Sequence, residues 1–259
     1  MIRTSPRLMT AGCLALYLFM YAPLLVLMVY SFTPAEYSLK FEGVTLKWYQ
    51  AVFRNDNILA ALKVSLMVAI PTVLISTAIG TITAFTLYRS KFVGRALYQG
   101  ILYIPLIMPD LVIGISLLLF YSFVKLELGI LSILLAHVSF SIPLTTLVII
   151  ARMQRIDRSL EDAAMDLGAD EWTTMWKVTL PLLKPGIVAA ALLTFPWSFN
   201  DFVITFFVSG VGSSTLPLRV YSMIRLGVSP MINALGTLIV LVPLILVIIG
   251  TRLARRSVS

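Results

Sequence analysis

Four stretches of the chain contain no Asp, Glu, Lys or Arg, and this feature constrains the fold more than any other. They run from Leu8 to Ala35, from Val64 to Tyr88, from Leu128 to Ala151 and from Leu226 to Thr251. An α-helix rises about 1.5 Å per residue, so roughly 20 apolar residues cross the hydrocarbon core of a bilayer. Each stretch is therefore long enough to cross. A content of 59% hydrophobic and 12% charged residues also favours a membrane protein over a soluble domain.

Two further apolar stretches are each interrupted by one carboxylate. Asp110 lies within residues 96–123, and Asp201 lies within residues 185–208. A charged side chain at membrane depth is costly and usually faces protein or water. We therefore predict an all-α integral membrane bundle of six transmembrane helices, built as a single domain over residues 1–259. The predicted spans cover about residues 8–33, 64–88, 96–123, 129–151, 185–208 and 231–251.

The distribution of basic residues predicts how these helices are oriented. Of the 20 Lys and Arg residues, thirteen fall at the termini and in the loops after the second and fourth spans, and seven fall on the other side. Because Lys and Arg accumulate in cytoplasmic loops, we predict that both termini are cytoplasmic. The net charge of +8 is then mainly a topology signal. No basic soluble domain is present that would suit a nucleic acid, so we expect membrane lipid and protein as partners.

Sequence motifs of enzyme chemistry are not found. The chain has no GxxxxGK[ST] phosphate loop, no HExxH zinc helix and no GxSxG nucleophile elbow. Cys13 is the only cysteine, so no internal disulfide is expected, and we predict no metal site. Asp110 and Asp201 could form the paired acids of an intramembrane aspartyl protease, or bind the coupling ion of a secondary carrier. A non-transporting membrane scaffold is another alternative, although it would not need acids at that depth.

A polar segment over about residues 152–184 separates the fourth and fifth spans, and its centre reads EDAAMDLGADEWTTMWKVTLP. It resembles the EAA loop of ABC importer permeases, with the consensus EAA, three residues, Gly, nine residues, then Ile, one residue, Leu and Pro. When the segment is aligned on the glycine, the matching residues are Asp162, Ala163, Ala164, Gly168, Val178, Leu180 and Pro181. Glu161 adds a second carboxylate at the start. The resemblance implies a cytoplasmic helix-turn-helix that docks on an ATPase subunit.

Elementary physical chemistry explains the residue types in this segment. Small residues such as Ala163 permit close approach of another protein, and Gly168 permits the positive φ that ends a helix. Asp170 is a plausible N-cap for a second short helix, on which Trp172 and Trp176 share a face. Prolines at 181 and 185 then start the next membrane span. The alternative is an amphipathic interfacial loop that docks on no partner.

The resemblance extends over essentially the whole chain. Segments such as PLIMPDLVIGISLLLF, EDAAMDLGA and TLPLRVYSMIRLGVSP resemble the second permease subunit of spermidine/putrescine-type importers. Similar permeases occur in the importers of iron, phosphonates and opines, and these solutes are alternative substrates. The family implies the type I ABC importer permease fold in the bacterial inner membrane. It also implies a partner permease that completes the pore, an ATPase dimer and an extracytoplasmic binding protein. ATP and Mg would be bound by the ATPase, so this chain itself would hold no cofactor and would not be an enzyme.

Helical spacing identifies candidate residues for the substrate path. Polar residues step along one face of the fifth span, and this stripe comprises Thr194, Ser198, Asp201 and Thr205. On the third span, Tyr103, Asp110, Gly114 and Tyr121 share a face, where aromatic rings beside a carboxylate would attract an ammonium group. The structural alternatives are that Asp110 caps a helix broken at Pro109, and that Asp201 pairs with a basic or amide group on a neighbouring span.

Two further polar residues of the spans need an interpretation. Asn200 stands where comparable polyamine permeases often have a second acid, so this chain offers one carboxylate fewer to a polycation. An amide oxygen can still accept a hydrogen bond from an ammonium group. His137 forms a polar stripe with Ser141 and Thr145 on the fourth span. A proton relay is conceivable there, but we interpret the histidine as a hydrogen-bonded packing residue between helices.

Overall fold

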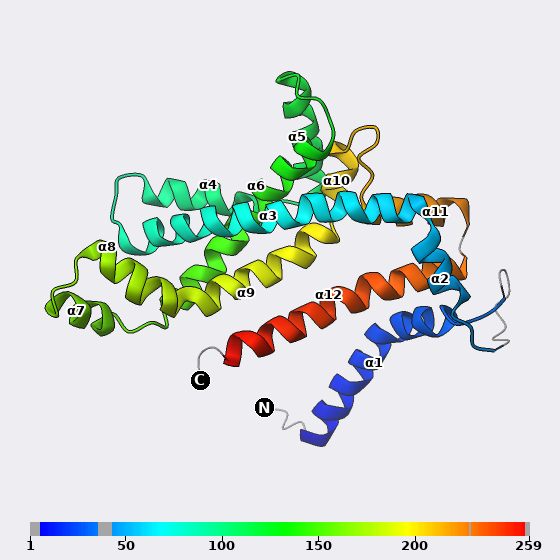
Figure 1. The fold of residues 1–259 in the computed structure, drawn as a ribbon, viewed down its shortest axis with the longest axis horizontal. Coiled ribbons are helices and arrows are strands. Elements are labelled where there is room, and N and C mark those ends of the chain that lie inside the picture. Colours follow the sequence, from blue (N-terminus) through cyan, green and yellow to red (C-terminus); the bar gives the residue numbers. More distant parts are fainter. Residues whose placement is uncertain (1–5, 36–42, 228, 257–259) are drawn as a thin grey trace. The chain divides into compact units, whose positions relative to one another are not determined.

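The computed structural model describes residues 6–35, 43–227 and 229–256, and within these ranges the secondary structure is helical. The longer helices are α1 (Pro6–Tyr30), α3 (Asp56–Arg89), α6 (Ile130–Met153), α9 (Leu180–Phe199) and α12 (Pro230–Arg256). The shorter ones are α2 (Lys47–Arg54), α4 (Arg95–Ile107), α5 (Asp110–Phe123), α7 (Ser159–Asp166), α8 (Glu171–Thr174), α10 (Val203–Val208) and α11 (Leu216–Leu226). A π-helical turn, η1 (Met175–Thr179), joins α8 to α9. Figure 1 shows the order of the α-helices along the chain.

Backbone contacts divide the chain into two compact units. The first comprises residues 1–59 and 219–242, and the second comprises residues 60–218 and 243–259. In the first unit, α2 is tied back to the segment after α1, because Trp48 Nε1 donates to the Thr33 carbonyl at 2.7 Å. The candidate functional residues all belong to the second unit. A single domain over the whole chain stays a prediction.

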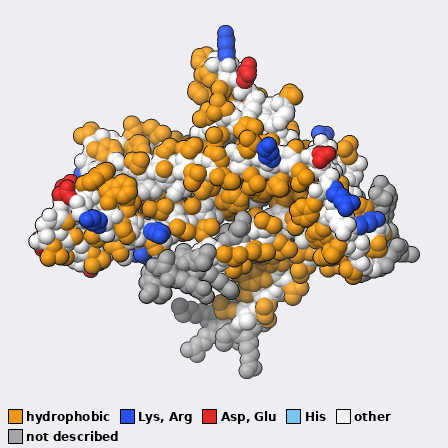
Figure 2. All heavy atoms as spheres, in the orientation of Figure 1, with side chains coloured by type: hydrophobic (Ala, Val, Ile, Leu, Met, Phe, Trp, Pro, Cys, Tyr) orange, Lys and Arg blue, Asp and Glu red, His pale blue; other side chains and the backbone are white. Residues whose placement is uncertain are grey.

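Five helical segments of the described part are long and apolar enough to cross a membrane: Met9–Tyr30, Asp56–Arg89, Ile130–Met153, Glu171–Phe199 and Pro230–Gly250. A sixth crossing results if the bent pair of α4 and α5 counts as one span. Hydrophobic side chains cover most of the visible surface, as a lipid-facing protein requires (Figure 2). The cytoplasmic location of the termini stays a prediction, and residues 1–5 and 257–259 lie outside the described part.

Two of the predicted spans are not continuous helices. The predicted span 96–123 is broken between α4 and α5, whose axes differ by 111°. Met108 is extended because the residue before a proline is pushed out of the helical region, so the predicted break at Pro109 is confirmed. The predicted capping by Asp110 is wrong, because Asp110 is the first residue of α5 and the helix start has no side-chain cap hydrogen bond. The predicted span 185–208 ends its first helix at Phe199 and resumes as α10 at Val203.

The second unit packs around α6. Near its N-terminus, α6 meets α5 and α10 in a cluster that includes Tyr121, Phe140 and Ile204. Near its C-terminus it meets α3 and α9 through Ala84, Ile149 and Leu183. Since lipid is as apolar as these side chains, close approach and interhelical hydrogen bonds must supply part of the stabilisation.

One crossing of α3 and α6 shows that close approach. A Cβ placed on Gly80 would lie 2.0 Å from Thr145 Oγ1, and the same hydroxyl donates to the Ser76 carbonyl at 2.9 Å.

Candidate functional site

The polar segment between α6 and α9 folds as two helical elements joined by a tight turn. The first is α7, and it ends before Gly168, which has a φ of +91°. The second begins after Asp170, whose carboxylate accepts from the Thr173 N–H at 3.0 Å. Hydrogen bonding with the Thr173 side chain and then with its backbone N–H lowers the pKa of Asp170, because both stabilise the charged form. The predicted positive φ at Gly168 and the predicted N-cap at Asp170 are both confirmed.

The sequence predicted that the second element ends before the membrane span begins. In the structure the two are continuous. The second element runs from Glu171 through η1 into α9 as one helical segment that ends at Phe199. The wide turn of η1 makes this continuity possible, because Leu180 N–H donates to the carbonyl of Met175, five residues back, just before Pro181. Proline has no N–H and clashes with the carbonyl four residues earlier, so a wider turn accommodates it.

The outer face of this segment is exposed and apolar. Trp172 is 66% exposed and Trp176 is 55% exposed, and their rings lie edge to face with centroids 5.6 Å apart. Leu167, in the turn, is 90% exposed. Most of the residues at the pattern positions are accessible or partly accessible: Asp162, Ala163, Ala164, Gly168, Val178, Leu180 and Pro181.

Glu161 differs from its neighbours because it points inward. It is 9% exposed, forms an ion pair with Arg89 at the end of α3, and accepts from Thr179 Oγ1 at 2.7 Å. It was predicted as part of the docking surface, but its carboxylate is occupied within the chain. No sequence pattern identifies Arg89 as its partner, because the two residues are 72 positions apart.

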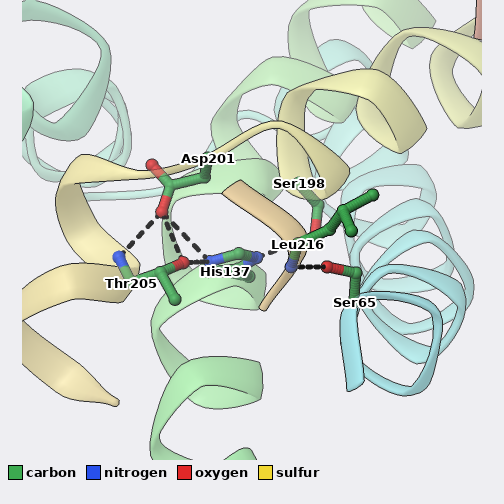
Figure 3. Close-up of polar contacts among 6 residues, drawn as sticks. All are labelled: Ser65, His137, Ser198, Asp201, Thr205 and Leu216. Carbon is green, nitrogen blue, oxygen red and sulfur yellow. Dashed lines mark hydrogen bonds and ion pairs between the residues drawn. The ribbon is translucent and has the colours of Figure 1, made fainter. Parts of the chain in front are cut away.

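A second candidate site is a buried polar cluster where α9 breaks, and it contains Ser198, Asp201, Thr205 and His137 (Figure 3). His137, on α6, is 1% exposed. Its Nδ1 lies 2.7 Å from Ser198 Oγ, and its Nε2 lies 2.9 Å from Thr205 Oγ1 and 3.3 Å from Asp201 Oδ2. The predicted path residues of the fifth span are thus joined by a histidine to which sequence reasoning assigned only a packing role.

The hydrogen bonds suit one tautomer of His137. Thr205 Oγ1 donates its only hydrogen to Asp201 Oδ2 at 2.7 Å. The same oxygen is then an acceptor for His137, which suits the tautomer with a proton on Nε2. The alternative that Asp201 pairs with a basic or amide group on a neighbouring span is confirmed by its contact with the His137 imidazole. The expectation that His137 is a hydrogen-bonded residue between helices is confirmed as well.

Asp201 also caps the helix that follows the break. Its Oδ2 accepts from the Thr205 N–H at 2.8 Å, which satisfies a donor at the start of α10. These contacts converge on Oδ2, and the other carboxylate oxygen points away from His137 and Thr205 (Figure 3). Asn200 is exposed beside it. The prediction that the polar stripe lies on one continuous helix is wrong, because α9 ends at Phe199 and Thr205 lies on α10. Thr194 stays on α9, where it is buried and donates to the Ala190 carbonyl.

The predicted face of the third span is not formed. Tyr103 lies on α4, whereas the other three members lie on α5 beyond the bend. Asp110 is exposed in the first turn of α5, where its charge suits the helix N-terminus. Gly114 lies against Phe207 of α10, and Tyr121 belongs to the core cluster. Within the described residues, no three His, Cys, Asp or Glu side chains gather as a metal site would require.

Helices of membrane length, an exposed helix-turn-helix between two of them and a polar break within the bundle define a membrane transport subunit. The chain belongs to the family described as the binding-protein-dependent transport system inner membrane component, whose pattern matches residues 76–259. The predicted multi-pass inner-membrane localisation is confirmed by this family.

Two curated relatives from Escherichia coli (strain K12) are similar over most of their length. The spermidine/putrescine transport system permease protein PotC is 37% identical over 96% of this chain and 95% of its own. The putrescine transport system permease protein PotI is 40% identical over 86% of this chain and 82% of its own. The predicted resemblance to polyamine importer permeases is confirmed.

Solved structures show the same fold. A chain of a bacterial ABC transporter involved in the import of the acidic polysaccharide alginate superposes with a TM-score of 0.76 at 16% identity, covering 96% of this chain and 94% of that one. A chain of the MetNI methionine ABC transporter, in inward-facing conformations, gives 0.63 at 18% identity, covering 83% and 99%. The predicted ABC importer permease fold is therefore confirmed.

Proposed function

We propose that this chain is the membrane-spanning subunit of an ATP-driven importer and forms half of a translocation path for polyamines such as putrescine and spermidine. The observation that carries this proposal is the 37% identity to a spermidine/putrescine permease over 96% of the chain. A partner permease completes the pore, and an extracytoplasmic binding protein delivers the substrate. ATP and Mg are bound by a separate ATPase dimer, so this chain has no cofactor and no catalytic residue of its own.

The exposed face of α7, η1 and the turn between them supports docking on the ATPase. Two large aromatic side chains and Leu167 offer apolar area at the tip of a short, well-capped element. Aromatic side chains of this kind dominate protein interfaces. The docking residues are Asp162, Ala163, Ala164, Gly168, Val178, Leu180 and Pro181.

The break between α9 and α10 supports a path for a cation. Asp201 directs one oxygen away from its own hydrogen-bonding partners, and Asn200 is exposed next to it. A carboxylate and an amide oxygen are both acceptors for an ammonium group. Ser198, Thr205 and His137 would orient this carboxylate, while Asp110 and Tyr103 would contact substrate elsewhere along the path. Asn200 also favours a second candidate, the same importer role for another small solute of the opine, phosphonate or iron type.

Uptake of labelled putrescine and spermidine tests this function. Cells would contain the partner permease, ATPase and binding protein, with and without this chain. Uptake should require the chain and survive collapse of the proton gradient while ATP is maintained. If uptake is lost when the proton gradient is collapsed, the protein is an ion-coupled carrier. If neither polyamine is taken up under any condition, the second candidate is favoured.

Asp201→Asn tests the path. Its amide oxygen can still accept from Thr205, so assembly should be retained. Uptake should fall about tenfold, as expected for loss of one charge-assisted hydrogen bond of about 1.5 kcal/mol. Asp56→Asn, at the exposed start of α3, is the matched control and should transport normally. Full activity of Asp201→Asn would restrict Asp201 to its capping role.

A further inference from the structure

The end of α3 and the start of α7 are joined by a polar cluster that the sequence pattern does not include. Arg89, in the last turn of α3, forms an ion pair with Glu161, in the first turn of α7. Thr179, at the end of η1, donates to the same Glu161 oxygen at 2.7 Å. Three elements therefore meet at one carboxylate, which lies beside a small pocket between α3, α6 and α9.

Each charge lies where its helix favours it. Arg89 is at the C-terminus of α3 and Glu161 is at the N-terminus of α7, so both are stabilised by the helix dipoles as well as by each other. Glu161 is nearly buried, and loss of either partner would leave its charge poorly compensated. A neighbouring contact strengthens the junction, because the Arg158 guanidinium lies 5.1 Å from the ring of Tyr88.

The π-helical turn η1 contributes Thr179, the third residue of the polar cluster. A π-turn shifts the angular position of every residue that follows it, relative to an unbroken α-helix. Thr179, the last residue of η1, is 2% exposed and faces Glu161, whereas Trp176 in the same turn is 55% exposed. One turn thus presents an apolar outer face and a polar inner contact.

Resting on the function proposed above, we propose that Arg89, Glu161 and Thr179 form a mechanical link that makes α3 move with the docking helix α7. Glu161 is then a positioning residue and not part of the ATPase contact. A docking helix can drive the pore only if its displacement reaches a membrane helix, and interfaces of this kind act through discrete packed contacts. The link supplies such a contact at the end of the 34-residue helix α3.

A charge swap in the complete transporter tests the link. Arg89→Glu and Glu161→Arg should each lower uptake about tenfold, a coupling typical of contacting charged residues, while the ATPase still co-purifies. The double variant should restore a large part of uptake. Lys91→Glu, an exposed charge reversal two residues after Arg89, is the matched control and should leave uptake unchanged. Thr179→Val removes only the hydroxyl and should give a smaller decrease.

Hydrogen exchange of the α7 amides tests the contact between Arg89 and Glu161 independently of transport activity. Exchange should be about tenfold faster in each single charge variant and return towards the wild-type rate in the double variant. If the wild type itself shows no ATP-driven uptake, the proposed function fails, and the exchange rates still decide the link. If Glu161→Arg no longer co-purifies with the ATPase, Glu161 contacts the ATPase directly, and the proposal is overturned. Single variants with normal uptake, or a double variant no better than either, would also overturn it.

Discussion

Gly168 is the residue whose conformation most directly shapes the docking element. Its φ of +91° is strained for any residue with a side chain, yet apart from the adjoining residues of the chain no atom lies within 4 Å of where a Cβ would stand. Replacement is therefore opposed by the backbone and not by packing. The left-handed region costs a residue other than glycine about 1–2 kcal/mol, and asparagine tolerates it better than most.

Gly168→Leu should therefore distort the turn between α7 and α8 and reduce ATPase co-purification while the chain still inserts into the membrane. Gly168→Asn should be milder, because asparagine accepts the αL conformation. Gly94, with a φ of +90° and equally open surroundings, lies before α4, so Gly94→Leu carries the same strain without touching the docking element. Unchanged co-purification and transport in Gly168→Leu would remove the docking argument.

At the scale of single elements, local signals predicted the docking segment well. Gly168 and Asp170 act through their own backbone or that of residues three positions away, so the sequence is enough to place them. The Arg89–Glu161 ion pair and the identity of the partners of His137 were not predicted, because packing brings these residues together. His137 and Thr205 are 68 positions apart, and the break at Asn200 that lets them meet carries no glycine or proline of its own.

The cap of α8 gives a prediction for a single element. Asp170→Ala should destabilise the start of the helix, seen as faster hydrogen exchange in residues 171–174. Because the folded-state pKa of Asp170 is lowered, the stabilisation is present at neutral pH and is lost as the pH falls through the lowered pKa. Asp170→Asn keeps an acceptor and should remove the pH dependence while retaining most of the cap. A pH-independent wild type would contradict this account.

The crossing of α3 and α6 gives a second prediction at this scale. A methyl group on Gly80 would meet Thr145 Oγ1 at 2.0 Å, so Gly80→Ala forces the helices apart or displaces the hydrogen bond to Ser76. We expect a loss of about 1–3 kcal/mol, measured as lower thermal stability in detergent. Gly100→Ala on α4 is the control, since nothing lies within 4 Å of its Cβ position, and it should be neutral or stabilising. Equal stability of the two variants would show that the crossing adapts freely.

At the scale of the whole molecule, the second unit determines whether α4 and α5 cross the membrane or return. The ends of α3 and α6 lie together, because Tyr88, Arg89 and Met153 line one pocket. Both helices are long enough to span, so their C-terminal ends share one side of the membrane and Ile130, where α6 begins, lies on the other. The chain must therefore cross once between Arg89 and Ile130. We therefore predict that the bent pair is a broken span and not a re-entrant loop, which would give six crossings within the described residues.

Cysteine labelling tests this topology directly, because Cys13 is the only cysteine and Cys13→Ser removes it. In that background, Lys125→Cys, after α5, should react with a membrane-impermeant maleimide added to intact cells. Lys91→Cys, before α4, should react only after the membrane is opened, as the excess of Lys and Arg in that loop predicts. Equal protection of both positions would make α4 and α5 re-entrant. It would also place the start of α6 on the same side as its end, which a spanning helix of 24 residues does not permit.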